Sequence, residues 1–143
     1  MLYFDTSFLT PLIKPESTSA EVTRFVAKLP KGALVISHWT RVEFSSAIAR
    51  EVRMGAMNTK DAHAADSLFE QIVAESFSVL LPGMGEFELA KQYLANHKTG
   101  LRAGDALHLA IANNHRATAI YSLDKKLIKA GKMLGLPVSK GIR

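Results

Sequence analysis

Four acidic residues lie directly beside short apolar runs in this sequence, and they are the residues best suited to do chemistry: Asp5, Glu43, Asp105 and Asp124. Carboxylates normally face water, because removing a charge from water is costly unless something pairs it. Their oxygens are also the ligands that hard divalent cations such as magnesium prefer. The repeated pattern of one acid beside one core-forming run therefore predicts a shared metal site.

The expected secondary structure places these acids on one side of the molecule. Asp5 and Asp124 follow predicted strands, Asp105 falls in the first turn of a predicted helix, and Glu43 lies one short connection after the second strand. In an open α/β sheet, ligands bind beyond the carboxyl ends of the strands. We therefore expect the four side chains to converge at that edge.

Each acid has a simpler structural explanation when taken alone. Asp105 and Asp124 suit the amino terminus of a helix, where a carboxylate is favoured by the helix dipole. Glu43 has Arg41 and Arg50 as candidate surface partners. Asp5 is harder to explain as a cap, because it follows the first strand so directly. The conjunction of all four favours a site.

The elements that position these acids alternate along the chain. Four near-continuous apolar runs are typical of parallel strands covered on both faces, and a fifth contains Pro137, which fits only an edge strand. These runs are 2–4, 33–37, 77–81, 119–122 and 136–139. The expected helices are 20–29, 44–54, one capped by Thr59, 87–96, 102–114 and 125–133. This alternation predicts an α/β fold with a central, mainly parallel sheet of four to five strands in one domain, 1–143.

Composition excludes several classes of protein. The chain has 143 residues, 48% of them apolar and 22% charged, which is typical of a folded domain. It has no cysteine, which excludes disulfides, thiolate zinc sites and cysteine nucleophiles. No apolar run reaches the roughly 18 residues of a membrane span, and the amino terminus lacks the features of a signal peptide. We expect a cytoplasmic protein that does not bind membranes.

Charge is distributed unevenly along the chain. Residues 1–96 carry a net charge of −2, whereas residues 97–143 carry +7, and the only acids in the second segment are Asp105 and Asp124. This distribution suggests a polyanion approaching a metal site, although a lysine-rich solvated surface explains the charge equally well.

The four acidic segments together resemble those of the PIN-domain ribonucleases, and among these the VapC-type toxins of toxin–antitoxin pairs. The similarity is carried by segments 1–7, 39–44, 104–110 and 122–127, in that order, and spreads over nearly the whole chain. One departure is Leu123, where the family often has Asn before the last acid. This departure makes Asp124 the weakest of the four matches.

The resemblance implies a three-layer α/β/α fold and cleavage of RNA that depends on Mg²⁺ or Mn²⁺. It implies that Asp5 and Asp105 bind the metal directly, and that Glu43 and Asp124 hold metal-bound water or a second ion. Residues expected near the RNA are Thr6, Ser7, Arg102, His108, Lys125 and Lys126, with Lys129 and Lys132 beyond them. A turn-stabilising role for the hydroxyls and a satisfied, partly buried His108 are the alternatives.

The resemblance also implies partners, namely a small antitoxin and a second copy of the chain. The segment 20–54, which has apolar residues such as Val22, Phe25, Val26, Trp39 and Phe44, is the candidate groove for an antitoxin helix. The alternative is that these residues pack against the sheet, and we expect this for at least half of them. The alternative function is a non-catalytic PIN-like module that binds RNA or a protein. Aspartyl-phosphate chemistry on Asp5 fits poorly, because haloacid-dehalogenase-like enzymes have a second acid where Ser7 stands, and receiver domains have paired acids that are missing here.

Overall fold

The computed structural model describes residues 1–143 and contains one five-stranded sheet. Its strands are β1 (Leu2–Phe4), β2 (Leu34–Ser37), β3 (Ser78–Leu80), β4 (Ala119–Tyr121) and β5 (Val138–Ser139). They run in the order β3-β2-β1-β4-β5, and every neighbouring pair is parallel. The predicted parallel sheet is confirmed, and Pro137 indeed lies just before the short edge strand β5.

The strand order reverses beside β1. The chain proceeds from β1 to β2 and β3 on one side and then returns to β4 and β5 on the other. A crevice for a ligand forms at such a switch point, beyond the carboxyl ends of the two strands. Here those ends lead into Asp5 and Ser122, and the backbone N–H of Asp5 donates to the carbonyl of Tyr121 across them (3.1 Å).

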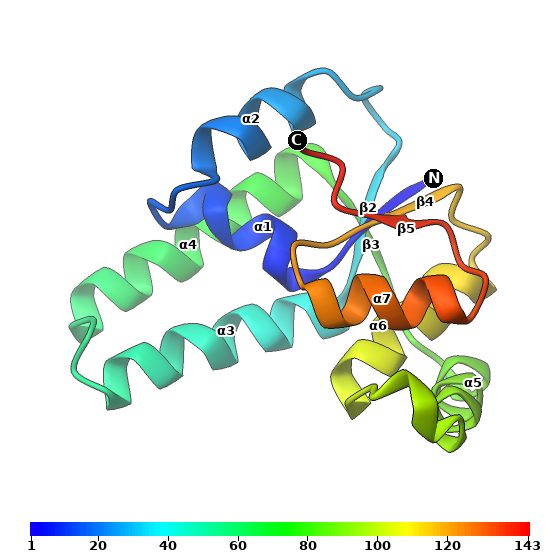
Figure 1. The fold of residues 1–143 in the computed structure, drawn as a ribbon. Coiled ribbons are helices and arrows are strands. Elements are labelled where there is room, and N and C mark those ends of the chain that lie inside the picture. Colours follow the sequence, from blue (N-terminus) through cyan, green and yellow to red (C-terminus); the bar gives the residue numbers. More distant parts are fainter.

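Seven α-helices and one short 3₁₀-helix cover the sheet (Figure 1). The α-helices are α1 (Thr6–Ile13), α2 (Ser19–Ala27), α3 (His38–Arg53), α4 (Thr59–Ser76), α5 (Met84–Ala95), α6 (Ala103–Asn114) and α7 (Lys125–Met133), and the 3₁₀-helix is η1 (His97–Thr99). Helices α1 to α4 pack on one face of the sheet and α5 to α7 on the other, which confirms the three-layer α/β/α architecture.

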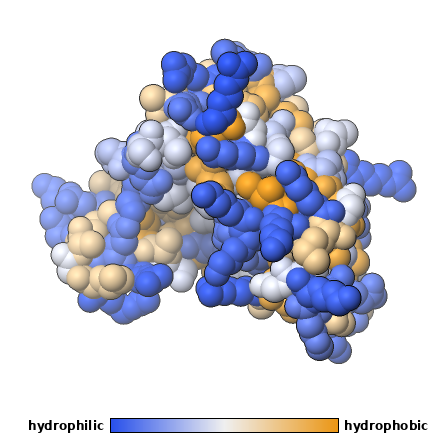
Figure 2. Space-filling model, viewed as in Figure 1, coloured by the Kyte–Doolittle hydropathy of each residue, from blue (hydrophilic) through white to orange (hydrophobic).

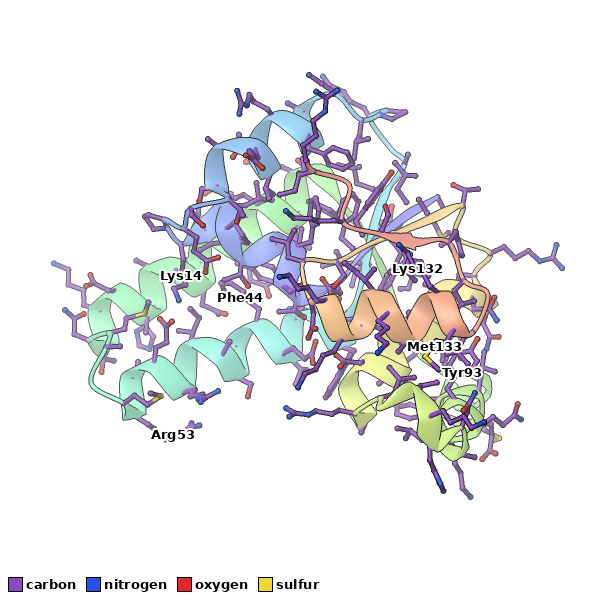
Figure 3. All side chains as sticks on the ribbon, in the orientation of Figure 1. Lys14, Phe44, Arg53, Tyr93, Lys132 and Met133 are labelled. Atoms are coloured by element: carbon purple, nitrogen blue, oxygen red, sulfur yellow. The ribbon has the colours of Figure 1, made fainter.

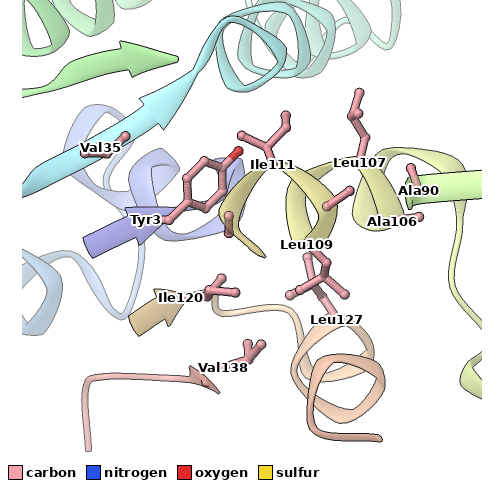
Figure 4. Close-up of a cluster of buried hydrophobic side chains, with 12 residues drawn as sticks. Tyr3, Val35, Ala90, Ala106, Leu107, Leu109, Ile111, Ile120, Leu127 and Val138 are labelled. Carbon is pink, nitrogen blue, oxygen red and sulfur yellow. The ribbon is translucent and has the colours of Figure 1, made fainter. Parts of the chain in front are cut away.

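Alternating strand residues divide the core between these two faces. Tyr3 contributes to the cluster under α5, α6 and α7, and Phe4 to the cluster under α1 to α4. Figure 4 shows Tyr3 reaching from β1 into the first cluster beside Ile111, with its hydroxyl at the edge of the apolar group. Successive strand residues point to opposite faces, so a continuous apolar run is required for a sheet covered on both sides.

The cluster on the α1–α4 face is rich in aromatic rings. Phe44 on α3, labelled in Figure 3, stacks on Phe69 of α4 with ring centroids 4.1 Å apart. Phe44 and Val22 are both fully buried in this cluster, so they cannot form the antitoxin groove expected in segment 20–54. Phe44 and Val22 belong to the core, whereas Phe25 of the same segment remains partly exposed.

Helix α1 was not expected from the sequence. It begins directly after Asp5, whose side chain caps it by accepting a hydrogen bond from the backbone N–H of Phe8 (3.1 Å). Asp5 is therefore a helix cap after all, contrary to the expectation from its place directly after the first strand. Pro11 within the helix and the threonines at its start obscured the helical pattern. Asn58, not Thr59, caps α4.

None of the helices combines the length and the apolar character that a membrane span needs.

Candidate active site at the carboxyl edge of the sheet

An open cleft of about 930 Å³ lies at the carboxyl edge of the sheet, between the start of α3 and the amino ends of α6 and α7. Three acids line it, together with a basic rim and a tryptophan. The lining residues are Trp39, Glu43, Gly100, Leu101, Arg102, Gly104, Asp105, Leu123, Asp124, Lys125 and Lys126. Three of the four predicted acids therefore share one cleft.

Asp5, the fourth acid, lies beneath the cleft and is only 3% exposed. Its Oδ1 accepts hydrogen bonds from the Ser7 hydroxyl (2.8 Å) and the Phe8 N–H, and its Oδ2 accepts one from the Ser122 hydroxyl (2.6 Å). Burial raises the pKa of Asp5, although His108 and these hydrogen bonds act in the opposite direction. Both oxygens are thus already engaged by the protein.

Glu43 is held by an internal network rather than by a surface arginine. Its Oε1 accepts a hydrogen bond from the Thr6 hydroxyl (2.7 Å) and pairs with Nε2 of His108. Arg41, one of its expected partners, instead pairs with Glu70 at 2.9 Å. Burial alone raises the pKa of Glu43, but the hydrogen bonds from His108 and Thr6 outweigh it and hold the pKa below its usual value.

His108 is buried and both of its ring nitrogens have partners inside the protein. It is 1% exposed, and its Nδ1 lies 2.8 Å from the Tyr3 hydroxyl. Burial disfavours the imidazolium, but Tyr3, Glu43 and Asp5 together raise the pKa of His108 to about 10. Ring and carboxylate therefore form a buried ion pair below that pH.

Asp105 and Asp124 stand at the rim, on the first turn of α6 and at the start of α7. Asp124 caps α7, because its Oδ1 accepts hydrogen bonds from the backbone N–H groups of Lys126 (2.7 Å) and Leu127. Asp105 lies at the positive end of α6, whose amino terminus has no side-chain cap. The simple cap explanation for Asp124 is therefore correct, and the residue lines the cleft as well.

The charges of the four acids reach one another at this edge. Partial burial raises the pKa of Asp105 to about 6, and the charges of Asp124, Glu43 and Asp5 raise it in the same direction, against His108. Like charges near one another make each carboxylate harder to ionise. The other three acids therefore lie close enough to Asp105 for their charges to raise its pKa.

The model of one family, described as the PIN domain, matches residues 2–133 of the chain. This chain belongs to the PIN domain family. The four acids all lie within the matched residues. The family resemblance inferred from the sequence is confirmed.

Several solved structures share the fold of this PIN domain. VapC20 of Mycobacterium tuberculosis, described as a sarcin-ricin loop cleaving toxin, has a TM-score of 0.73 at 20% identity, covering 92% of this chain and 95% of its own. FitAcB of Neisseria gonorrhoeae has a TM-score of 0.77 at 18% identity, covering 99% and 98%. VapBC-1 of nontypeable Haemophilus influenzae has a TM-score of 0.69 at 18% identity, covering 99% and 98%. No curated protein matches the chain in sequence.

Some of the basic residues of the PIN domain lie at the cleft. Arg102, Lys125 and Lys126 line the cleft, and all three are exposed. Lys129 and Lys132 continue this group along α7, and Figure 3 shows Lys132 towards the carboxyl end of that helix. Hydrophilic side chains gather over α7 in the space-filling view (Figure 2). The positive potential therefore extends from the cleft along one helix.

The remaining predicted RNA contacts are not among the residues that line the cleft. The Thr6 hydroxyl donates a hydrogen bond to Glu43, and the Ser7 hydroxyl donates one to Asp5. His108 is too deeply buried to reach a ligand in the cleft. These three side chains hold the acids in place. The expectation that His108 contacts RNA does not fit this structure, whereas the alternative of a satisfied histidine does.

Three residues of the site were not identified from the sequence. Ser122 binds Asp5, Tyr3 binds His108, and Trp39 donates from its Nε1 to the carbonyl of Gly104 (3.3 Å) while lining the cleft. Ser122 and Trp39 belong to the acidic segments themselves. Their proximity in sequence to Asp124 and Glu43 was the available signal.

The carboxylate oxygens of the site are chemically suited to a divalent cation, but the side chains are not arranged around a single point where one would bind. No three acidic or histidine side chains stand close enough together to hold a metal ion as they are placed. Asp105 and Asp124 nevertheless line one cleft, and partial burial, together with the charges of the neighbouring acids, raises the pKa of Asp105. Asp5 Oδ2 accepts a single hydrogen bond, from Ser122, so this oxygen keeps a lone pair with which it would bind a metal.

Proposed function

We propose that this PIN domain is a metal-dependent endoribonuclease, the toxin of a toxin–antitoxin pair. One observation carries the proposal: Glu43, Asp105 and Asp124 line the same cleft as Arg102, Lys125 and Lys126. Acids that need a cation lie beside bases that attract phosphates, as the cutting of a phosphodiester requires. Family membership supports the proposal independently.

We expect Mg²⁺ or Mn²⁺ to be held at the rim by Asp105 and Asp124, with Asp5 beneath them. A bound divalent cation polarises a phosphoryl oxygen and lowers the pKa of its water, which supplies the nucleophile near neutral pH. Ser7 and Ser122 keep the Asp5 carboxylate oriented, and Glu43 presents its carboxylate to the cleft from α3. Lys125, Lys126 and Arg102 neutralise and position the RNA backbone.

RNA cleavage with defined metals tests this function directly. The purified chain should cut labelled single-stranded and hairpin RNAs with Mg²⁺ or Mn²⁺, and EDTA should stop the reaction. The matched control is Asp105→Asn, which preserves size and hydrogen bonding but removes the charge. Binding of RNA without any cleavage under these conditions would favour the alternative of a non-catalytic binding module.

The proposed toxin needs a partner that restrains it. Structural neighbours include assemblies described as FitAB and VapBC-1, each at less than 25% identity. We propose that a small antitoxin covers the cleft and brings an arginine or lysine to the acids, because Glu43, Asp105 and Asp124 line the same cleft. Expression of the chain alone in the bacterial cytoplasm should arrest growth, and co-expression with the antitoxin should relieve the arrest.

A homodimer is part of the same proposal. Large apolar side chains are exposed on α3 and at the start of α5, namely Val42 (57%), Met84 (83%) and Phe87 (56%). Exposed apolar groups of this kind are typical of protein interfaces. Sedimentation of the purified chain should give the mass of two copies, and Phe87→Asp should give the mass of one. A monomeric wild-type chain at micromolar concentration would contradict the dimer.

A further inference from the structure

We propose that His108 and Gly104, both on α6, are positioning residues that leave Glu43 with a single free oxygen, Oε2, facing the cleft. The inference rests on the proposed nuclease function, because it says how one acid of that site is presented. It assigns no contact with RNA to His108. Both residues act by setting the orientation of the Glu43 side chain.

The first step is the saturation of Glu43 Oε1. This oxygen accepts a hydrogen bond from the Thr6 hydroxyl at 2.7 Å and pairs with His108 Nε2. The hydrogen bonds to the Glu43 side chain all fall on Oε1. One donor comes from α1 and the other from α6, so Glu43 on α3 is gripped from two neighbouring helices.

The second step is that the His108 ring cannot turn away. Its Nδ1 lies 2.8 Å from the hydroxyl of Tyr3 on β1, and that hydroxyl lies 3.0 Å from Ser37 Oγ. Ser37 is in turn the N-cap of α3, the helix that carries Glu43. The contacts therefore close a loop from the start of α3 through Tyr3 and His108 back to Glu43. All of its inner members are buried.

The third step concerns Oε2, on the opposite side of the carboxylate. A Cβ placed on Gly104 would lie 2.8 Å from Glu43 Oε2 and 3.3 Å from the Trp39 ring. Real Cβ atoms essentially never approach an oxygen so closely, so any larger residue here would push the carboxylate aside. Gly104 thus provides the space in which Oε2 lies, and both residues line the cleft.

These contacts define one orientation for Glu43. His108 and Thr6 hold Oε1 inward, and the absent side chain at position 104 lets Oε2 point outward beside Asp105. A carboxylate fixed in this way offers one oxygen to a cation or to its water, and it does so before the ligand arrives. Groups that orient a ligand in this manner typically change metal affinity by roughly 10- to 100-fold when removed.

The test uses four single variants and measures Mn²⁺ binding by electron paramagnetic resonance without RNA, alongside RNA cleavage. His108→Leu removes both ring contacts, whereas His108→Gln keeps a donor for Glu43 and an acceptor for Tyr3. Gly104→Ala adds the Cβ against Oε2. Gly85→Ala is its control, because a Cβ there meets only Asn114 Nδ2 at an ordinary 3.6 Å on α5, outside the cleft. Circular dichroism establishes that each variant is folded.

We expect His108→Leu and Gly104→Ala to weaken Mn²⁺ binding roughly 10-fold or more and to lower kcat more than they raise KM. His108→Gln should recover most of the affinity, and Gly85→Ala should bind as the wild type does. In a Glu43→Gln background, Gly104→Ala and His108→Leu should cause little further loss, because their effect passes through Glu43.

Either of two results with the variants would overturn the inference: wild-type Mn²⁺ affinity in Gly104→Ala, or full additivity of Gly104→Ala or His108→Leu with Glu43→Gln. A wild-type chain that binds no Mn²⁺ would overturn it as well. The proposed function fails separately, when the wild type binds Mn²⁺ in a way that depends on His108 and Gly104 but cuts no RNA.

Discussion

The inner acids of the cleft and the acids at its rim are held in opposite ways. Asp5 and Glu43 accept hydrogen bonds from neighbouring hydroxyls, a backbone amide and His108. At the rim, Asp124 engages one oxygen as a helix cap, and Asp105 has the negative charges of the other three acids around it. Side-chain hydrogen bonds fix Asp5 and Glu43, although Glu43 also lines the cleft, whereas no other side chain holds Asp105 or Asp124 in this way.

The difference shows where a cation gains most. The charge of Glu43 is already balanced by His108, which lowers its pKa, whereas the pKa of Asp105 is raised to about 6. A cation entering the cleft relieves the repulsion around Asp105 and finds the inner oxygens already oriented. We therefore describe the inner pair as a scaffold and the rim pair as the place where charge is needed.

The largest expected effect comes from removing one charge from each pair. Asp5→Asn and Asp105→Asn should each reduce metal-dependent RNA cleavage by roughly 100-fold or more, because the metal loses a ligand worth several kcal/mol in the transition state. The asparagine oxygen at position 5 still caps α1, so the fold should persist. Initial rates at saturating Mg²⁺ measure the effect, and a variant that retains full activity would remove that acid from the site.

A second prediction concerns how the stability of the folded chain depends on pH through Asp105, an acid of the rim pair. The pKa of Asp105 is about 6 in the folded chain and 3.8 in the unfolded chain. The stability that the protonated carboxyl gives the fold is therefore fully present below pH 4 and is lost as the pH rises through 6. Without metal, Asp105→Asn should therefore be more stable than the wild type above pH 6, by on the order of 1 kcal/mol after allowance for partial exposure.

Thermal unfolding in EDTA at pH 4, 5, 6 and 7.5 measures this difference. The gap in Tm should be roughly 3 °C at pH 7.5 and should close towards pH 4. Added Mn²⁺ should reverse its sign, because the ion binds the folded wild type more tightly than the variant. A gap that does not change with pH would show that Asp105 carries no unusual charge burden.

A third prediction concerns the basic rim, whose effect should be smaller than that of the acids. Lys125 and Lys126 line the cleft, so the double alanine variant should bind RNA more weakly and reduce the slope of log K against log salt by about one to two units. Fluorescence anisotropy in EDTA measures binding without cleavage. Lys31→Ala and Lys60→Ala, outside the cleft, should leave the slope unchanged.

The smallest expected signal comes from Trp39, the only tryptophan in the chain. It lines the cleft and is hydrogen-bonded to Gly104, so a ligand that enters should change its emission. Titration with RNA in EDTA should shift or quench the fluorescence in parallel with binding. Binding without any change in emission would place the RNA outside this cleft.

The sequence predicted which residues meet, but not how each is held. Asp5, Glu43, Asp105 and Asp124 follow from the alternation of strands and helices, because the carboxyl ends of parallel strands share one edge. The partner of Glu43 did not follow, because His108 lies 65 residues away and Arg41 is close by in sequence. Local spacing favours near neighbours, whereas the fold decides which distant side chains are packed together.

The core shows the same division. Apolar runs at Leu34–Ser37 and Ala119–Tyr121 are long enough to be recognised as buried strands. Helix α1 is short, contains Pro11 and starts directly after Asp5, so its propensity is weak and tertiary packing of Phe8 stabilises it. Phe44 and Val22, which were candidates for a partner surface, are buried in the core between the sheet and helices α1 to α4.

The most direct test of a scaffold pair and a rim pair is a crystal structure of the wild-type chain with Mn²⁺, located by its anomalous signal. The account predicts a peak in the cleft bound by Asp105, with Oε2 of Glu43 turned towards it and Oε1 still paired with His108. A peak only at other acids, such as Asp61 and Asp66 on α4, or a Glu43 that has left His108, would contradict it.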